Sequence, residues 1–177
     1  MNFDQYAQKI YKQNKEVGWW DDPNRCLYEC LQLVSTEVAE ATEAERKDLM
    51  DDHLPHRKGG EVELADALIR VLDLGAHLGR CHVSVPCVPF AIGNWSIGRR
   101  HWWINSCLTD FEDAALGGVV VSLEADDSYS RLIQSICMVA HSMRYDIEGA
   151  MLEKLEYNRK RQDHKREERA KAGGKKF

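Results

Sequence analysis

Apolar residues recur every three or four positions along most of the chain, and this helical period limits the possible folds more than any other feature of the sequence. The apolar side chains of residues 3–11 have this spacing, and Gly18 ends the segment. A second helix is predicted from Pro23 to about Leu49, with Asp22 as its N-cap. The first part of the chain is therefore expected to form two helices.

The period is interrupted and then returns. Residues 51–60, with a proline and a pair of glycines, are predicted to form a loop, and a third helix should follow over 61–78. Residues 80–128 show no sustained period apart from a short β-like run at 119–121, and we expect an irregular insert there. Helical spacing resumes at Leu132 and continues through two closing helices. The sequence thus predicts an all-α protein, a bundle of about five helices with the insert before the last two.

The size and composition are those of one soluble domain. Of the 177 residues, 44% are hydrophobic and 30% are charged, which excludes a disordered chain and allows residues 1–177 to bury a core without disulfide bridges. The first residues lack a basic and then apolar leader, and no apolar run approaches the roughly 18 residues that cross a bilayer. We expect a cytoplasmic protein with no membrane partner and with six reduced cysteines.

Charge is distributed unevenly along the chain. Residues 154–177 contain ten Lys or Arg and four Asp or Glu, so the net charge of −5 combines an acidic body with a basic C-terminal tail at about 160–177. A basic tail can hold phosphates or nucleic acid, but such a run is also typical of a solvated, frayed helix end.

Two pairs of carboxylates stand three residues apart on neighbouring predicted helices. Glu37 and Glu40 belong to the second helix, and Glu63 and Asp66 belong to the third. Residues with this spacing point the same way from adjacent turns, so each pair can share one ion. Oxygen ligands favour a hard cation such as Mg²⁺ or Mn²⁺. The alternative is that the pairs form solvated helix faces.

The polar residues of the third predicted helix form a narrow stripe. At about 100° per residue they fall within a sector of about 80°, and apolar residues fill most of the remainder; they are Glu63, Asp66, Arg70, Asp73 and His77. Partly buried carboxylates on such a stripe repel each other unless cations neutralise them. A di-iron centre of the ferritin type is less consistent with the pattern, because it requires His three residues after Glu.

A cationic and polar face is predicted on the last helix. Lys154, Asn158 and Arg161 are spaced so that an ammonium, an amide and a guanidinium lie on one side. This face suits a polyphosphate, although a solvated face has the same spacing. Together with the two acidic pairs it offers both charge signs that a metal-bound triphosphate needs.

In these motifs the chain resembles the MazG-like branch of the all-α nucleoside triphosphate pyrophosphohydrolases. The family's Glu-x-x-Glu and Glu-x-x-Asp pairs correspond to Glu37/Glu40 and Glu63/Asp66, and the resemblance extends to residues 18–21, 63–73 and 153–161. Two features depart from the family pattern. Thr36 stands where many members have a further Glu, and small members lack residues 80–128.

The resemblance implies a Mg²⁺- or Mn²⁺-dependent enzyme that converts a nucleoside triphosphate to the monophosphate and pyrophosphate. The implied metal ligands are the four paired carboxylates Glu37, Glu40, Glu63 and Asp66, and either Glu37 or Glu40 would act as general base. Lys154 and Asn158, with Arg161, would bind phosphate oxygens. Members of the family assemble as dimers or tetramers, and phage members often favour deoxynucleotides, so the resemblance implies a homo-oligomer with dGTP as the candidate substrate. The implied location is the cytoplasm of a bacterium or of a phage-infected host cell.

Recognition of the base is expected to involve aromatic rings. Trp19, Trp20 and Tyr157 offer stacking surfaces, although a Trp pair at a helix end is also typical of a core. In the insert, a zinc site built from Cys81, His82, Cys87, His101 and Cys107 is disfavoured because no Cys-x-x-Cys pair is present. The aromatic and basic run 94–103 suits a protein interface or a base-stacking surface.

Two other functional classes stay open on the sequence alone. The chain can be a nucleic-acid-binding module that uses the tail and the insert, or a helical interaction protein that keeps the fold without catalysis. The complete set of four carboxylates favours the enzyme over both, and nucleic acid is not the expected partner.

Overall fold

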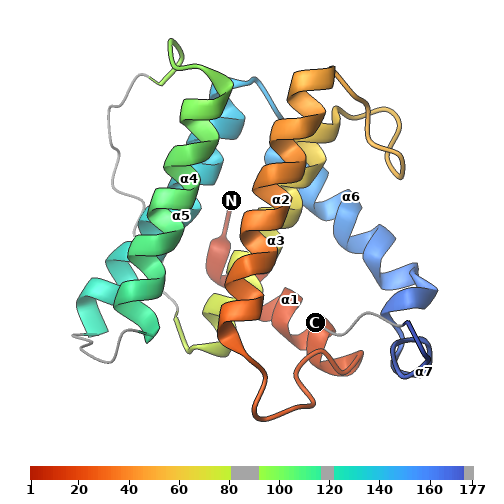
Figure 1. Cartoon of the computed structure of the whole chain (residues 1–177). Coiled ribbons are helices and arrows are strands. Elements are labelled where there is room, and N and C mark those ends of the chain that lie inside the picture. The colour runs from red at the N-terminus through yellow and green to blue at the C-terminus, as the bar shows by residue number, and fades with distance from the viewer. Residues whose placement is uncertain (81–91, 117–121, 174–177) are drawn as a thin grey trace.

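The computed structural model describes residues 1–80, 92–116 and 122–173, and within these ranges the protein is built from helices without a strand (Figure 1). The predicted all-α class is confirmed. The helices in chain order are α1 (Phe3–Glu16), α2 (Leu27–Lys47), α3 (Gly59–His77), α4 (Ile97–Leu116), α5 (Ser122–Ser142), α6 (Ile147–Lys160), the 3₁₀ helix η1 (Gln162–His164) and the short α7 (Arg166–Arg169).

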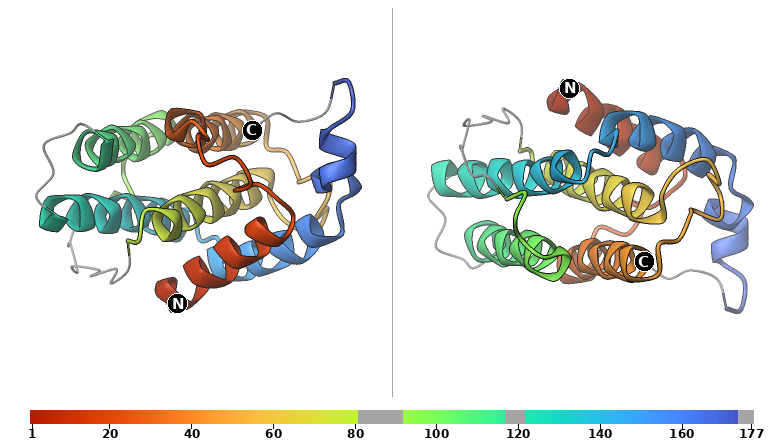
Figure 2. Two further views of the ribbon diagram at one scale, coloured as in Figure 1. Left: turned by 90° about the horizontal axis from the view of Figure 1, so that it is seen from below. Right: turned by 90° about the horizontal axis from the view of Figure 1, so that it is seen from above.

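The longer helices form three layers with α3 at the centre. Figure 2 shows α2 beside α4 in one layer, α3 beside α5 in the middle layer, and α1 beside α6 in the third. Helix α3 packs against α1, α2, α5 and α6. Its side chains Leu64, Leu68 and Leu72, one turn apart, have no exposed surface. Because α3 packs against these helices, polar side chains such as Glu63, Asp66 and Asp73 are at least partly buried, whereas His77 at its C-terminal end is exposed.

The packing of α3 against α5 depends on one glycine. A Cβ atom on Gly75 would lie 2.3 Å from the ring of Tyr129, far inside van der Waals contact. The Tyr129 ring is 2% exposed and also packs on Phe111 of α4, with 5.6 Å between ring centroids. Because Gly75 has no side chain, the Tyr129 ring of α5 fits against α3 and also packs on Phe111 of α4.

Helix boundaries follow local hydrogen bonds. The Asn2 side chain accepts a hydrogen bond from the Gln5 amide and begins α1, whereas Gly18, at φ 84°, takes the left-handed conformation after its end. The second helix begins at Leu27, not at Pro23 as predicted. The reason is local, because Asp22 accepts a hydrogen bond from the Asn24 amide at 2.8 Å and forms a turn instead of capping a helix.

The prediction of an irregular insert over residues 80–128 is wrong for most of the described part of that range. Residues Ile97–Leu116 form α4, and α5 already begins at Ser122. On α4, Ile104, Leu108 and Phe111 are buried at helical spacing. The aromatic and basic residues at the start of α4 obscure this helical period in the sequence. The apolar residues are buried because α4 packs against α5. Residues 81–91 and the β-like run 119–121 lie outside the described residues.

The C-terminal segment folds back onto the linker between α1 and α2. Arg166 Nε donates a hydrogen bond to Asp21 at 2.7 Å, and Arg169 Nη2 donates one to the Val17 carbonyl at 2.7 Å. The Arg169 guanidinium also lies 4.0 Å from the centroid of the Trp19 ring. The basic tail is thus attached to the body as far as α7. Among the described residues, no helix combines the length and the apolar character needed to span a membrane.

Candidate active site

Three carboxylates meet between α2 and α3. Glu37 of α2 and Glu63 and Asp66 of α3 each offer an oxygen, and these oxygens all lie within 4.8 Å of one another. The spacing of Glu63 and Asp66 places both on one side of α3, and the close packing of α2 on α3 brings Glu37 to them. Glu37 is buried and the other two are partly buried. The structure therefore concentrates negative charge in a mostly enclosed site.

The pKa values of the α3 carboxyls reflect this crowding. Burial, together with repulsion from Asp66, raises the pKa of Glu63 to about 8, against a smaller lowering by Lys154. Burial also raises the pKa of Asp66, even though the Lys154 ammonium opposes the shift. Within the described residues no basic side chain forms an ion pair with Glu63. The site therefore holds protons more tightly than exposed carboxyls do, first because it is buried and second because its carboxyls crowd one another.

Two basic side chains reach the cluster. The buried Lys154 Nζ of α6 lies 3.0 Å from Asp66 Oδ2, and Arg70 Nε donates a hydrogen bond to Glu37 Oε1 at 2.5 Å. Burial lowers the pKa of Lys154, but the attraction of Asp66, Glu63 and Asp51 outweighs burial, so the pKa lies above its ordinary value. Lys154 is therefore a charged ammonium held inside the protein.

The loop between α2 and α3 contributes a fourth carboxylate that the sequence analysis did not identify. Asp51 Oδ2 lies 4.0 Å from Lys154 Nζ, and both side chains are 4% exposed. Asp51 Oδ1 accepts hydrogen bonds from the amides of His53 at 2.9 Å and Leu54 at 2.6 Å. An aspartate two residues before a turn amide is a recognisable loop signal, but it gives no indication of a contact with a distant helix.

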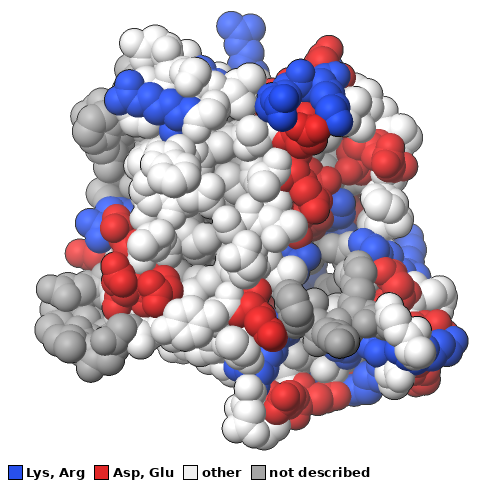
Figure 3. Space-filling model, in the orientation of Figure 1, with Lys and Arg blue, Asp and Glu red and all other residues white. Residues whose placement is uncertain are grey.

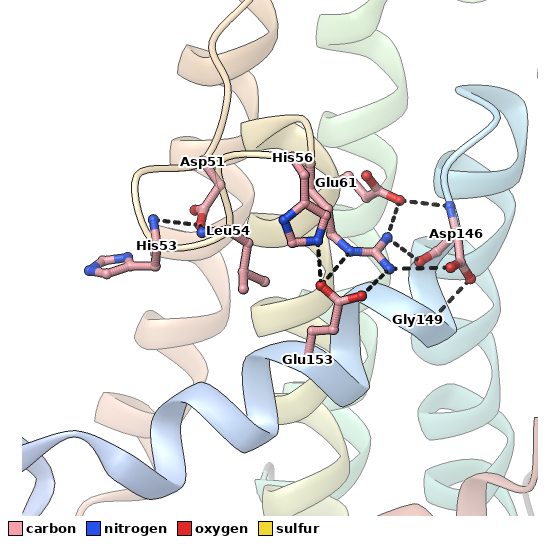
Figure 4. A network of polar contacts seen from close by, with 9 residues as sticks. Asp51, His53, Leu54, His56, Glu61, Asp146, Gly149 and Glu153 are labelled. Carbon is pink, nitrogen blue, oxygen red and sulfur yellow. Dashed lines mark hydrogen bonds and ion pairs between the residues drawn. The ribbon is translucent and has the colours of Figure 1, made fainter.

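Arg57 connects the same loop to α6 through ion pairs with Asp146 and Glu153, two residues that Figure 4 labels. Its guanidinium donates hydrogen bonds to Glu153 Oε1 at 2.8 Å, to Glu153 Oε2 at 3.1 Å and to Glu61 Oε1 at 2.9 Å. Glu61 Oε1 also accepts a hydrogen bond from the Asp146 amide at the start of α6, at 2.8 Å. Glu153 directly precedes Lys154, so the network fixes the helix turn that carries the buried ammonium.

Glu40 is the one predicted metal ligand that the structure does not bring into the cluster. Its side chain is exposed on α2, whereas Glu37, three residues earlier, is buried. Figure 3 shows acidic side chains gathered along α2, while the surface over the middle of α4 is largely uncharged. Glu40 lies close enough to Glu63 to raise its pKa, after the larger effects of burial and Asp66.

A pocket of about 110 Å³ adjoins the cluster, and of the predicted phosphate side it is lined by Asn158 and Arg161 but not by Lys154. Asp66 and Arg70 line it beside Asn158 and Arg161, and Trp19 of the α1–α2 linker closes another part of the wall. Asn158 Oδ1 is buried and has no hydrogen-bond partner among the described residues. A buried amide oxygen without a partner favours a ligand or water at this position.

Arg161 and Tyr157 are engaged with neighbouring side chains. Arg161 donates hydrogen bonds to both carboxylate oxygens of Asp163, at 2.9 and 2.7 Å, while still lining the pocket. The Tyr157 ring packs on His53 of the α2–α3 loop, with 4.5 Å between ring centroids. The structure therefore places Arg161 at the pocket and Tyr157 against the loop.

Trp20 supports the pocket from behind. Its ring stacks on His77 with 3.9 Å between centroids and an interplanar angle of 10°, and the Arg25 guanidinium lies 4.5 Å from the ring centroid. Its indole N–H donates to Asp73, which also accepts a hydrogen bond from Asn14 Nδ2 at 2.8 Å. Asp73 lines the pocket, so Trp20 orients a wall residue, and Trp19 is the tryptophan that lines the pocket itself.

The residues considered for zinc do not gather into a site within the described ranges. His101 Nδ1 forms a hydrogen bond with Thr42 Oγ1 at 2.7 Å, and Cys107 is a buried free thiol. Burial lowers the pKa of His101 to about 4, so the ring is neutral and belongs to the packing. Cys81, His82 and Cys87 lie outside the described residues. The cysteines that the structure describes, Cys26, Cys30, Cys107 and Cys137, are all free.

In the comparisons with known proteins, no family model, no curated protein and no solved structure matches this chain. The resemblance to the MazG-like family therefore stays an expectation from the motifs. The function has to be argued from the geometry of the site.

Proposed function

We propose that the protein hydrolyses a nucleoside triphosphate to the monophosphate and pyrophosphate with the help of Mg²⁺ or Mn²⁺. The observation that carries the proposal is the group of three carboxylates with oxygens within 4.8 Å of one another, beside a buried lysine. The negative carboxylates suit a divalent cation, and the positive ammonium of the lysine suits phosphate. Few other reactions require both signs within one enclosed site.

The donor set fits a hard divalent cation. All candidate ligands are carboxylate oxygens, and the raised pKa values of Glu63 and Asp66 express an excess of negative charge that a cation relieves. Glu37, Glu63 and Asp66 would hold the cation, and Glu40 stays a candidate fourth ligand on the exposed side of α2. A bound cation would supply Lewis-acid activation of water and neutralise phosphate charge.

The side chains of α6 and the adjoining pocket would hold the triphosphate. Lys154 offers a full positive charge, and Asn158 offers an amide whose N–H groups can donate to phosphate oxygens. Arg161, at the end of α6, and Arg70, on α3, add guanidinium groups at the pocket wall. As charge develops on the leaving pyrophosphate, these cations stabilise the transition state more than the ground state.

A carboxylate of the α2 pair would accept the proton of the attacking water. Glu37 forms an ion pair with Arg70 in the structure, whereas Glu40 is exposed, and either of them fits the role. The nucleoside would lie toward Trp19 and Asp73 of the pocket wall. Trp20 would act through Asp73, and Tyr157 would contact the substrate from the loop side.

The same proposal covers the finer expectations from the family resemblance. The substrate is a deoxynucleoside triphosphate, with dGTP as the specific candidate, and the protein works in the cytoplasm as a dimer or tetramer. Membership of the MazG-like family is part of the proposal, supported by the order of the motifs and by the meeting of Glu37, Glu63 and Asp66.

The test is product analysis with the purified protein. All eight common NTPs and dNTPs are incubated with Mg²⁺, and the products are separated by anion-exchange chromatography. We expect a monophosphate and pyrophosphate, no reaction in EDTA, and recovery with Mg²⁺ or Mn²⁺. A nucleoside diphosphate with orthophosphate as the only products contradicts the proposal. Strong DNA binding without turnover supports a nucleic-acid-binding module instead.

A further inference from the structure

The buried ammonium of Lys154 lies between two carboxylates from different parts of the chain. It is 3.0 Å from Asp66 Oδ2 on α3 and 4.0 Å from Asp51 Oδ2 in the α2–α3 loop. The side chains of Lys154 and Asp51 are each 4% exposed, and that of Asp66 is 14% exposed. An ammonium this deeply buried needs an anionic partner at all times, because an unpaired buried charge is strongly destabilising.

Asp51 is held in place independently of Lys154. Its Oδ1 atom accepts the two backbone amides of His53 and Leu54, which leaves Oδ2 directed at the ammonium. The Asp51 amide donates a hydrogen bond to the Arg57 carbonyl at 3.1 Å, and the Arg57 side chain is anchored on Glu153 (Figure 4). Hydrogen bonds therefore join the α2–α3 loop to the turn of α6 that carries Lys154.

Asp66 faces two competing demands. In the structure it accepts a hydrogen bond from Lys154, yet in the proposed function the same carboxylate holds a divalent cation. Two positive groups on one small carboxylate repel each other, so the contact between Lys154 and Asp66 weakens when a cation is present. Among the carboxylates that the structure describes, Asp51 is the one outside the candidate ligand set that already lies within ion-pair distance of Lys154.

We propose that Asp51 is a positioning residue that takes over Lys154 when Asp66 coordinates a divalent cation, and so keeps the ammonium directed at the phosphate side of the site. This inference rests on the metal-binding part of the proposed function. Lys154 Nζ lies 4.0 Å from Asp51 Oδ2 and 3.0 Å from Asp66 Oδ2. A small displacement of Nζ toward Asp51 is therefore enough to exchange one carboxylate partner for the other. Without Asp51, cation binding would leave a buried ammonium with no carboxylate of its own.

The decisive variant is Asp51→Asn. Its side-chain oxygen can still accept the amides of the turn, so the loop is retained, whereas the charge next to Lys154 is lost. We expect the dissociation constant for Mn²⁺ to rise about 3- to 100-fold, the range of coupling between charged groups in contact. The matched control is Asp52→Asn, at an exposed position one residue later, which should leave Mn²⁺ binding unchanged.

Loss of a negative charge near a cation also weakens binding directly, and a double-mutant cycle separates the two causes. Mn²⁺ affinity is measured by calorimetry and by electron paramagnetic resonance for wild type, Asp51→Asn, Lys154→Met and the double variant. If Asp51 acts through Lys154, Asp51→Asn weakens binding at least about threefold more in wild type than in the Lys154→Met background. An equal or larger effect in the Lys154→Met background overturns the inference.

Folding and function are checked alongside. Thermal melts without Mn²⁺ identify a variant that does not fold, and Lys154→Gln replaces Lys154→Met in the cycle if needed. Coupling between Asp51 and Lys154 in a protein that binds Mn²⁺ but hydrolyses no triphosphate overturns the proposed reaction and supports this inference. Full hydrolysis without coupling overturns this inference alone, and a wild-type protein that binds no Mn²⁺ overturns both.

Discussion

Two buried and charged basic side chains of the described part of the protein, Arg100 and Lys154, lie in very different surroundings. Arg100 of α4 is 8% exposed and donates hydrogen bonds to the backbone carbonyls of Ile92 at 3.3 Å and Gly93 at 2.7 Å. No carboxylate of the described residues forms an ion pair with it. Lys154 of α6 is 3% exposed and lies among Asp66, Asp51 and Glu63.

The difference separates a structural cation, Arg100, from the cation that we propose to be functional, Lys154. The donors of Arg100 are used by neutral carbonyls of the chain just before α4, so its role is to fasten that chain to the helix. Around Lys154 the carboxylates outnumber the cations, because only Lys154 and Arg70 neutralise Glu37, Glu63, Asp66 and Asp51. An excess of one charge sign in an enclosed place favours the binding of a further ion.

The largest loss of activity is expected when a carboxylate of the acidic cluster is replaced by its amide. Glu63→Gln and Asp66→Asn should each lower kcat/KM by more than about 1,000-fold, because each removes a proposed ligand of the cation. The measurement is pyrophosphate release under saturating Mg²⁺. Glu43→Gln, which breaks an exposed ion pair with Lys47 on α2, is the control and should keep wild-type activity. Near-normal turnover of both ligand variants would make the cluster structural.

Truncation of the functional cation should have the next largest effect. Lys154→Ala should lower kcat/KM by roughly 10- to 1,000-fold, about 1.4 to 4 kcal/mol of transition-state stabilisation. Lys160→Ala is the matched control, since Lys160 is an exposed lysine on the same helix that pairs with Glu156. If both variants show unchanged kinetics, Lys154 belongs with Arg100 as a structural residue.

The structural cation should show the opposite pattern. Arg100→Met should lower the free energy of unfolding by about 2 to 4 kcal/mol, because it removes the donors of two backbone carbonyls. The folded fraction should hydrolyse substrate at the wild-type kcat, because Arg100 does not contact the acidic cluster. Chemical denaturation and steady-state kinetics on the same preparation test both statements. A large loss of kcat in the folded Arg100→Met protein would contradict the distinction between a structural Arg100 and a functional Lys154.

The smallest effect concerns pH. Because the pKa of Glu63 is raised to about 8 in the folded protein, the folded state holds this proton more tightly than the unfolded state. The resulting stabilisation is complete below the ordinary glutamate pKa and is lost as the pH rises through about 8.

The metal-free protein should therefore lose stability from this group as the pH rises from about 5 to about 8. Glu63→Gln should flatten that part of the profile. Thermal melts in EDTA at several pH values give the comparison, and identical profiles for wild type and Glu63→Gln would show that Glu63 is not perturbed. Asp110→Asn, at an exposed position on α4, should retain the wild-type slope.

The helical period was sufficient to predict most of the fold. Helices α1, α2, α3 and α6 coincide with predicted segments, with shifts of a few residues at their ends, whereas α5 begins at Ser122, well before the predicted return of helical spacing at Leu132. Helix α4 was missed because Trp102, Trp103 and the adjacent arginines obscure its apolar stripe. Its helical character depends on burial of Ile104 and Phe111 against α5, and a single sequence does not show that burial.

In the candidate site, too, some features follow from local sequence spacing and others from tertiary packing. The spacing of Glu63 and Asp66, and of Lys154 and Asn158, determines which side chains share a face of one helix, because that relation is local. The rotation of each helix about its own axis is not local. Packing of α2 on α3 turned Glu37 inward and left Glu40 in solvent, although about 60° around the helix separates them.

Contacts between distant segments were decided by tertiary structure alone. The sequence by itself determined an all-α chain with acidic pairs on successive helices and a cationic face on a later one. Only the folded protein placed Asp51 beside Lys154, anchored Arg57 on Glu153 and stacked Trp20 on His77. The physical reason is that helical spacing follows from neighbours along the chain, whereas the partner of a buried charge depends on which loops and helices the core brings together.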